Sequence, residues 1–453
     1  MKKSPILFFL LFTAFSGNAP GLAAGTDVES RLRALEETLQ KQEETIKEQQ
    51  RVINELKEQI KATRGPGTAD VAGAAERPAD VPKTAKATGL FGGSYMMNPN
   101  VSLVLNTYAS TSSLSNGELR NSGIPGYTTE GFDRRNGFNL DAAELYLYAP
   151  VDPYFNVYAT IPATENGTTV EEAYFVTTAL PAGHQIKGGK FKSGFGRLNA
   201  VHPHAWDFVD APLPYRAFLG GEGLIEKGAQ YTYLAPLPFY TVLGAEVLQG
   251  DNNTLFGADA AKGAHAYVFF AKASLDVSDY GTILFGPSFV TGKTKTDTVA
   301  ANSEFMGDSS MYDFEFTYKW KPSKDRGFKL QSEYLYRTQS GDLTGTALGT
   351  VQRLSRNQDG LYIQGVYLWD RWEFGARYDT LNLFQADYTL DGTKQDLGRR
   401  PWRATGMVDY KFSEFSLLRF QYNHDEANTT GKVNDEALLQ AIFSIGAHGA
   451  HQF

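Results

Sequence analysis

The sequence predicts an all-β transmembrane barrel of about 16 antiparallel strands, preceded by a short α-helical coiled coil. Three observations predict this fold. Apolar and polar residues alternate in many segments of strand length, the links between these segments alternate between short and long, and a seven-residue apolar repeat lies near the N-terminus. The 453 residues include 45 Gly, 24 Tyr and 30 Phe, and this abundance favours a β-rich chain.

The composition excludes several classes of protein. The chain has no cysteine, so it has no disulfides, no cysteine-ligated zinc or iron–sulfur site and no covalently attached haem. Its formal charge of -8 argues against a nucleic-acid partner, because such proteins present a basic surface. No motif for a catalytic nucleophile stands out, so we expect neither an enzyme nor a resident cofactor.

Residues 1–25 have the order of a secretory signal peptide. Lys2 and Lys3 precede an apolar run from 6 to 15, and small residues follow up to Gly25. The apolar run is too short to cross a bilayer as a helix, and the alternative is a short buried helix. We expect the mature chain to be exported and to lack a transmembrane helix.

Residues 26–63 carry a heptad repeat. Its apolar core is formed by Leu32, Leu35, Leu39, Ile46, Ile53, Leu56 and Ile60. A seam kept in register over this length predicts helices that supercoil around one another, whereas a lone amphipathic helix on a membrane, the alternative, would show a wider apolar face. Ile at the first heptad position with Gln42 and Gln49 at the fourth favours a homotrimer over a dimer. We expect this coiled coil to lie in the periplasm.

Residues 64–88 separate the coiled coil from the barrel. Gly65, Pro66 and Pro78 lie among Ala, Thr, Asp and Lys, and the segment has no large apolar side chain. Such a composition cannot bury a core, so it predicts a disordered linker. The barrel then takes residues 89–453.

The barrel region has an apolar period of two. In one segment Tyr312, Phe314 and Phe316 alternate with Asp313 and Glu315. We count sixteen such segments, and a length of about ten residues suits tilted membrane-spanning strands. A soluble sandwich, the alternative, has no reason to alternate short and long links, whereas an outer-membrane barrel places them at opposite rims. The long links are 110–137, 193–226, 292–310, 340–358 and 383–400.

The C-terminal segment resembles the terminal signal of bacterial outer-membrane proteins. It alternates Leu439, Ala441, Phe443 and Ile445 with other residues and ends in Phe453. The resemblance implies that the barrel-assembly machinery reads Phe453. It also implies that the barrel lies in the lipid of the cell outer membrane.

A barrel of about sixteen strands is too wide to be filled by its own wall, so we expect an aqueous lumen. The polar faces of the strands should face this lumen, where charged rings can set the preference for ions. The charged residues on these faces carry both signs and are Glu315, Glu333, Arg337, Arg371, Glu373, Arg377, Asp379 and Arg419. The alternative is that these charges only pair with one another and hydrate the wall.

The longest link, 193–226, is rich in glycine, proline and aromatic residues such as Phe195, Trp206 and Phe218. This aromatic surface is unfavourable in solvent, and a fold into the lumen would bury it and narrow the pore. The arrangement resembles general and substrate-specific porins, in which the third loop forms the constriction; the alternative is a loop packed on the outer rim or on a neighbouring subunit. The candidates for the constriction are Lys192, Arg197, Asp207, Asp210, Arg216, Glu222 and Glu226.

His202 and His204 are weak candidates for metal ligands. Together with Asp207 or Asp210 they could bind zinc or copper. No third ligand lies at a defined spacing from the pair, so ordinary loop histidines are the favoured interpretation. The sequence therefore predicts no metal site.

The combination of coiled coil, linker and barrel resembles the phosphate-selective porin O/P-like group. We predict a porin for passive diffusion of small polar or ionic solutes, and phosphate itself is not expected because the inward faces mix acids and bases. A second hypothesis is a non-catalytic sleeve that holds a multihaem cytochrome in an outer-membrane electron conduit. That role requires a periplasmic cytochrome as partner, because this chain cannot hold covalent haem itself.

Overall fold

The computed structural model describes residues 99–345, 349–428 and 430–446. The chain divides into two compact units, residues 1–83 and 84–453, and the described residues all belong to the second. The predicted signal peptide, coiled coil and linker lie outside the described residues, as does the C-terminal phenylalanine.

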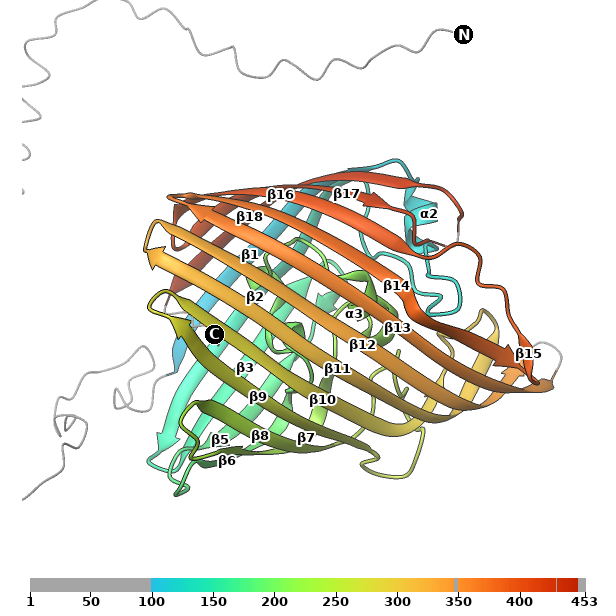
Figure 1. The fold of residues 1–453 in the computed structure, drawn as a ribbon, viewed down its shortest axis with the longest axis horizontal. Coiled ribbons are helices and arrows are strands. Elements are labelled where there is room, and N and C mark those ends of the chain that lie inside the picture. The colour runs from blue at the N-terminus through green and yellow to red at the C-terminus, as the bar shows by residue number, and fades with distance from the viewer. Residues whose placement is uncertain (1–98, 346–348, 429, 447–453) are drawn as a thin grey trace, which may run out of the picture. The chain divides into compact units, whose positions relative to one another are not determined.

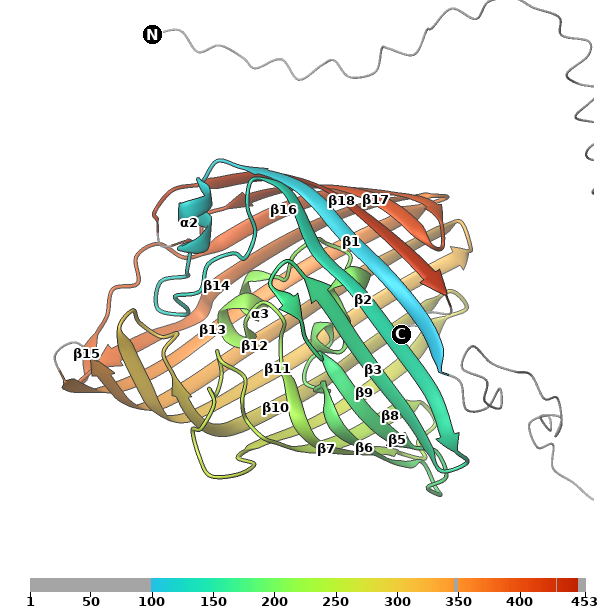
Figure 2. The ribbon, with the colours of Figure 1, turned by 180° about the vertical axis from the view of Figure 1, so that it is seen from behind.

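The strands of the second unit form one antiparallel sheet (Figures 1 and 2). The long strands are β1 (Asn100–Ser112), β2 (Gly137–Asp152), β3 (Phe155–Thr164), β5 (Glu172–Thr177), β6 (His184–Lys192), β7 (Ile225–Leu234), β8 (Tyr240–Leu248), β9 (Ala266–Ser278), β10 (Gly281–Thr296), β11 (Ser303–Ser323), β12 (Arg326–Gly345), β13 (Thr350–Trp369), β14 (Trp372–Leu390), β16 (Trp402–Ser413), β17 (Ser416–Asp425) and β18 (Asn434–Gly446). Two strands of only 2 residues, β4 (Gly167–Thr168) and β15 (Thr393–Lys394), extend the ends of β3 and β14.

The barrel closes because the first strand pairs with the last. β1 hydrogen-bonds to β2 on one side and to β18 on the other, with Leu105 opposite Phe443 at the closing pair. Each of the sixteen long strands therefore has two neighbours, and within the described residues the ring has no open edge. The prediction of an all-β barrel with about sixteen antiparallel strands is confirmed.

The links between strands contain short helices. They are α2 (Asn116–Arg120), two 3₁₀ turns at Leu198–Ala200 and Pro203–Ala205, and α3 (Leu213–Leu219). α2 begins with a capping box, in which Ser115 and Glu118 satisfy each other's backbone N–H groups. No helix among the described residues is long and apolar enough to cross a membrane.

The two faces of the wall differ in polarity, as a lipid-facing barrel requires. On β11, Tyr312 and Phe314 point outward and are 47% and 50% exposed. Asp313 and Glu315 alternate with them and are buried on the inner side. The alternation seen in the sequence therefore separates a lipid-facing coat from a polar inner wall.

Aromatic residues form two bands on the outside of β14, β16 and β17. Near the short turns, Trp372 packs on Tyr410 with ring centroids 4.8 Å apart. Further along the same strands, Tyr378 packs on Trp402 with centroids 6.1 Å apart. Phe420 lies between the two bands and is 50% exposed. Aromatic bands at both membrane interfaces are typical of outer-membrane barrels.

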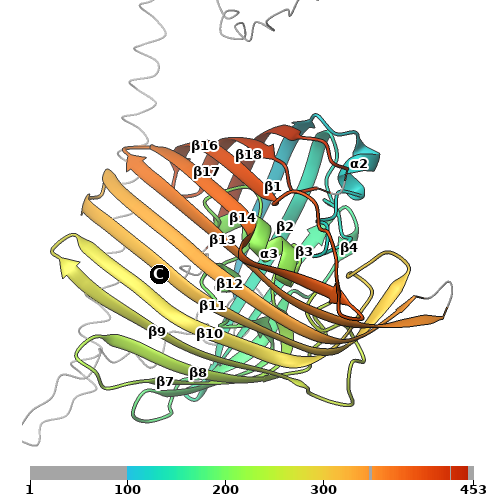
Figure 3. The same cartoon turned by 45° about the vertical axis from the view of Figure 1, so that its right-hand side comes forward.

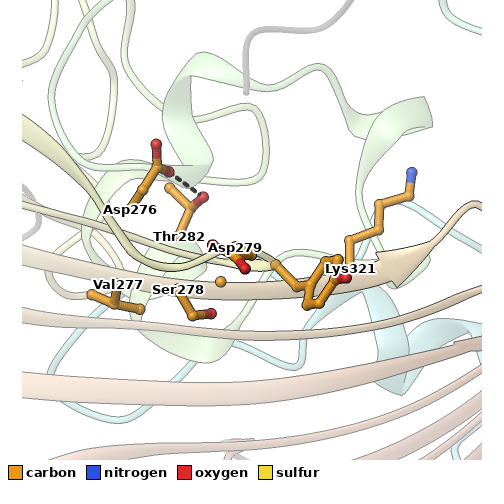
Figure 4. A pocket seen from close by; sticks show the side chains of 8 residues that line it. Asp276, Val277, Ser278, Asp279, Thr282 and Lys321 are labelled. Carbon is orange, nitrogen blue, oxygen red and sulfur yellow. Dashed lines mark hydrogen bonds between the residues drawn. The ribbon is translucent and has the colours of Figure 1, made fainter.

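One rim of the barrel is made of short turns. These connect β9 to β10, β11 to β12, β13 to β14 and β16 to β17. In the turn between β9 and β10, Thr282 Oγ1 donates to Asp276 Oδ1 at 2.7 Å, and Lys321 of the next strand lies beside it (Figure 4). The residues around this turn line an open surface pocket at the rim.

Three links predicted as long loops are largely strand. β11 to β13 are 20–21 residues long, whereas β16 and β17 have 12 and 10 residues (Figure 3). The predicted loops at 292–310 and 340–358 are therefore mostly paired backbone, and β14 extends into the predicted loop at 383–400 as far as Leu390. Apolar residues are scattered on these extensions, and Phe305, Leu343, Leu354 and Tyr388 form a buried cluster there. The regular apolar period of two is therefore lost although the ladder of hydrogen bonds continues.

We expect a charge in the middle of the lipid-facing coat to destabilise the barrel. Phe420→Arg should lower the free energy of unfolding by about 2–4 kcal/mol, because an arginine at this depth loses its hydration. Phe412→Arg, at the short-turn rim, should cost about 1 kcal/mol or less. Urea unfolding of the protein in lipid vesicles measures both, and equal costs at the two positions would contradict the assigned membrane depth.

Candidate functional site

The link between β6 and β7, residues 193–224, lies inside the barrel. α3 and the coil before it are surrounded by strands in both views of the ribbon (Figures 1 and 2). Backbone N–H groups of this link donate to side chains of the inner wall: Gly194 to Glu246 at 2.7 Å, Leu198 to Glu333 at 2.9 Å and Val209 to Gln421 at 2.7 Å. We call residues 193–224 the inner loop. It packs on the lumenal wall and not on the outer rim.

The inner loop approaches the wall closely at Gly196. Its φ of +64° is unfavourable for other residues, and a Cβ atom there would lie 2.6 Å from Glu333 Oε2. Glycine at this position lets the next two N–H groups, of Arg197 and Leu198, donate to the Glu333 carboxylate at 2.8 and 2.9 Å. The Tyr362 hydroxyl also donates to Glu333.

Apolar side chains hold the inner loop against the wall. Phe195, Leu213 and Phe218 of the loop are fully buried in the main apolar cluster of the protein. The wall contributes inward-facing apolar residues to this cluster, namely Leu248, Val268, Val290, Met311, Leu335 and Leu381. Each large side chain buried in this way contributes about 1.5–3 kcal/mol. These wall residues are apolar side chains on otherwise polar inner faces. In the sequence, such apolar residues at inward positions indicate where the inner loop packs.

Asp210 joins the inner loop to the wall through buried ion pairs. Its carboxylate lies 2.9 Å from Arg377 Nη2, 2.9 Å from Arg403 Nη1 and 3.5 Å from Arg134 Nη1. Arg403 also pairs with Asp379 at 2.7 Å. Burial alone would raise the pKa of Asp210, but the three guanidinium groups outweigh it and lower that pKa. Asp210 is therefore ionised, and it shares the buried arginines with two carboxylates of the wall, Asp379 and Glu436.

The link between β1 and β2 packs on the inner loop. Arg216 of α3 lies over the Phe132 ring at 3.6 Å and donates to the backbone oxygens of Ser122 and Glu130 at 3.0 Å each. Tyr127 and Phe218 are in ring contact, with centroids 5.5 Å apart. The two links therefore fill part of the lumen together.

The residues predicted for the constriction have different surroundings. Lys192 pairs with Glu171 at 2.8 Å, Asp210 and Arg216 are held as described above, and Glu226 accepts backbone N–H groups of residues 250–252. Asp207 is half-buried and pairs with Lys329, and Arg197 is also half-buried. Glu222 is exposed. The partly accessible members of the set are therefore Arg197, Asp207 and Glu222.

Most charges predicted to face the lumen are buried against the inner loop or within the wall. This group contains Glu315, Glu333, Arg337, Arg377, Asp379 and Arg419. Glu373 is half-buried and pairs with Lys411 at 2.6 Å. Arg371 is different: it lies exposed in the turn between β13 and β14. Arg371 was predicted to face the lumen because the alternation of polar and apolar residues was followed past the end of the strand.

A set of lysines on the inner wall was not singled out in the sequence. Lys272, Lys319, Lys329 and Lys411 occupy inward positions on β9, β11, β12 and β16, near the short turns. Lys319 lies directly opposite Lys329 in the strand register. In each described ion pair of this set the lysine is the more exposed partner: Lys329 and Asp207 are 28% and 15% exposed, Lys411 and Glu373 are 40% and 18%. The alternation of polar and apolar residues that predicts inward-facing acidic residues also places these lysines on the inner face of the strands.

His202 and His204 meet carboxylates of the wall. His202 lies near Glu144, Glu171 and Glu172, and His204 Nδ1 is 3.3 Å from Glu144. The residues expected beside the pair, Asp207 and Asp210, pair with lysine and arginine instead. Burial alone would lower the pKa of His202, but hydrogen bonds to the three glutamates outweigh it and raise that pKa well above its ordinary value. The wall therefore attracts positive charge at this point.

The closed ring, the lipid-facing coat and the loop folded inside define a β-barrel of the outer-membrane porin type. Among solved structures, the outer membrane channel DcaP of Acinetobacter baumannii shares the fold, with 12% identity over 77% of this chain and 97% of that chain and a TM-score of 0.50. The anion-selective porin from Comamonas acidovorans aligns with 8% identity over 77% and 99% of the two chains and a TM-score of 0.48.

The sequence is also similar to a protein of Aquifex aeolicus (strain VF5). The two are 40% identical over 380 residues, which cover 78% of this chain and 80% of the relative. The chain belongs to the same family as that protein, whose name is given as "Uncharacterized protein". No family model matches the chain. Membership of the phosphate-selective porin O/P-like group remains a prediction.

Removal of the Asp210 carboxylate should loosen the inner loop. Asp210→Ala leaves three buried guanidinium groups without this partner, so we expect the free energy of unfolding to fall by about 3–5 kcal/mol. Asp342→Ala is the matched control, because Asp342 pairs with Arg353 at 3.2 Å on an exposed surface, and its loss should cost about 1 kcal/mol or less. Urea unfolding in detergent micelles measures the difference; equal effects would contradict the role given to Asp210.

Proposed function

We propose that the chain forms a water-filled channel in the outer membrane for passive diffusion of small polar or ionic solutes. The observation that carries this proposal is the inner loop, which crosses a ring of sixteen strands and packs on its wall. Rings of this size leave an aqueous channel, so a loop held inside narrows the path without any need for catalysis. The exposed and half-buried charges around the loop then meet the solute.

The lysines near the short turns favour anions on this path. In their ion pairs the lysine side chains are more exposed than the carboxylates, so the accessible charge is mainly positive. Lys319 and Lys329 lie opposite each other, and this like-charge pair adds to the positive potential. The local field thus has the opposite sign to the net charge of the chain.

Conductance in a planar bilayer tests the channel and its selectivity. The full-length protein should give discrete open steps, and a KCl gradient should give a reversal potential on the chloride side. Lys319→Glu with Lys329→Glu should move that potential toward potassium, because the rim changes sign. Lys293→Glu is the control, since Lys293 pairs with Asp308 on an exposed part of β10 and should leave the potential unchanged.

The two parts of this proposal fail separately. An absence of open steps from correctly folded protein would overturn the channel. Open steps with an unchanged reversal potential in the double variant would overturn the role of the lysines and leave the channel intact.

The porin is favoured over a sleeve for a multihaem cytochrome. A cytochrome inside the barrel would have to displace the inner loop, whose aromatic residues and Asp210 ion pairs are buried against the wall. Separation of these buried contacts is unfavourable. A haem-containing partner that co-purifies with a non-conducting barrel would support the sleeve instead.

We further propose that residues 26–63 form a periplasmic coiled coil that holds three copies of the chain together. The heptad core from Leu32 to Ile60 supports this, since its seam needs partner helices to cover it. Deletion of residues 28–62 should convert the cross-linked trimer into smaller species while the barrel still folds. Chemical cross-linking followed by gel electrophoresis measures this, and unchanged trimers after the deletion would contradict the role of the coiled coil.

A further inference from the structure

Two histidines of the inner loop and three glutamates of the wall converge at one point of the lumen. His202 precedes the 3₁₀ turn at Pro203–Ala205 and His204 lies within it. Glu144 comes from β2, Glu172 is the first residue of β5, and Glu171 comes directly before it. The side chains of all five are 7–14% exposed. The group therefore joins the loop to two strands that lie on either side of β3.

The distances between the donor atoms suit a metal ion. His202 Nδ1 lies 3.7 Å from Glu144 Oε1 and 3.6 Å from Glu171 Oε2, and His204 Nδ1 lies 3.3 Å from Glu144 Oε2. Ligands about 2.0 Å from a tetrahedral zinc ion are about 3.3 Å apart. One ligand atom each from Glu144, Glu171 and His202 lies within 4.8 Å of the others. Small side-chain adjustments would bring these donors to a shared ion.

Glu172 orients His202 toward this point. Its Oε2 lies 2.8 Å from His202 Nε2, and its Oε1 accepts the backbone N–H of Lys192 at 2.7 Å. With Nε2 directed at Glu172, His202 presents Nδ1 to Glu144 and Glu171. A carboxylate that holds the far nitrogen of a ligating histidine is a recurrent feature of metal sites, where it fixes the ring and its tautomer.

The charge of the group also calls for a cation. Three carboxylates face one ammonium group, that of Lys192, which lies 2.8 Å from Glu171 Oε1, and two histidines that carry positive charge only when protonated. Buried carboxylates are unfavourable unless they are paired or bind a metal. A divalent ion would replace the histidine protons as the positive charge that faces these carboxylates.

We propose that Glu144, Glu171, His202 and His204 bind a divalent transition-metal ion of the zinc type, with Glu172 as the residue that positions His202. The donors are imidazole nitrogens and carboxylate oxygens, which suit Zn²⁺ and its neighbours Co²⁺ and Ni²⁺. The ion ties the first part of the inner loop to β2 and β5. The Asp210 ion pairs hold the later part of the loop elsewhere on the wall.

Metal binding to the full-length protein tests the proposal. The protein is purified without a histidine tag, stripped with EDTA and dialysed against Zn²⁺, and bound metal is measured by mass spectrometry. We expect one Zn²⁺ per chain and a higher unfolding temperature with Zn²⁺, because a ligand that binds only the folded state stabilises it. Co²⁺ in place of Zn²⁺ should give visible absorption typical of a protein-bound ion. Substoichiometric Zn²⁺ and no Co²⁺ absorption would overturn the proposal.

Variants locate the site. His202→Ala with His204→Ala should abolish stoichiometric binding, and Glu172→Gln should weaken it by about 10–100-fold, as expected for a positioning carboxylate. His424→Ala is the matched control, since His424 lies 2.8 Å from Asp435 on an exposed surface and should leave binding unchanged. His448→Ala with His451→Ala should also leave it unchanged. Heat-modifiable mobility on gels reports the folding of each variant.

Two further outcomes would contradict the site. One is full Zn²⁺ binding by folded protein that lacks both loop histidines. The other is loss of binding in either control. If the double variant does not fold, His204→Ala and Glu171→Gln take its place, and each should lower the affinity for Zn²⁺ by at least tenfold.

Discussion

The closure of the sheet is the constraint on which the rest of the structure depends. Lipid offers no water to backbone N–H and C=O groups, so all of them must be paired, and a ring of strands achieves this without an edge. β1 meets the requirement by pairing with β18 and β2 at once. Once the ring is closed, alternation along each strand sends apolar side chains to the lipid and polar ones inward. The width of the ring then leaves a lumen that the strands alone cannot fill.

The inner loop occupies this lumen through two kinds of contact, and each compensates for a weakness of the other. Apolar packing of Phe195 and Phe218 on inward residues such as Leu335 is strong but has little directional preference. The pairs of Asp210 with Arg377 and Arg403 are directional, and their burial makes any displaced position of the loop unfavourable. Together they make the loop a fixed part of the wall, so the width of the path is set by structure rather than by a moving lid.

Local signals in the sequence were sufficient for the barrel and insufficient for the site. Alternation is a property of neighbouring residues, so strand number and the outward faces could be read directly. The extensions of β10 to β14, where the alternation is irregular, were taken for loops. The partners of His202 are Glu144 and Glu171, which reach it only through the pairing of β2, β3 and β5. The spacing of these residues along the chain does not predict that His202 lies beside Glu144 and Glu171. For Arg371 the alternation was followed too far, because β13 ends at Trp369 and Arg371 lies in the turn before β14.

The position of the contacts shows how the inner loop is held across the lumen. The start of the inner loop meets β2 and β5, close to β6 from which it emerges, while its later part meets β14, β16 and β17 in another sector of the ring. Between these anchors the loop crosses the lumen. The buried charges serve the anchors, whereas the more exposed lysines, Lys329 and Lys411, stand on the wall near the short turns. The proposed selectivity and the anchoring therefore share Lys329, which pairs with Asp207 of the inner loop, whereas Lys411 pairs with Glu373 of the wall.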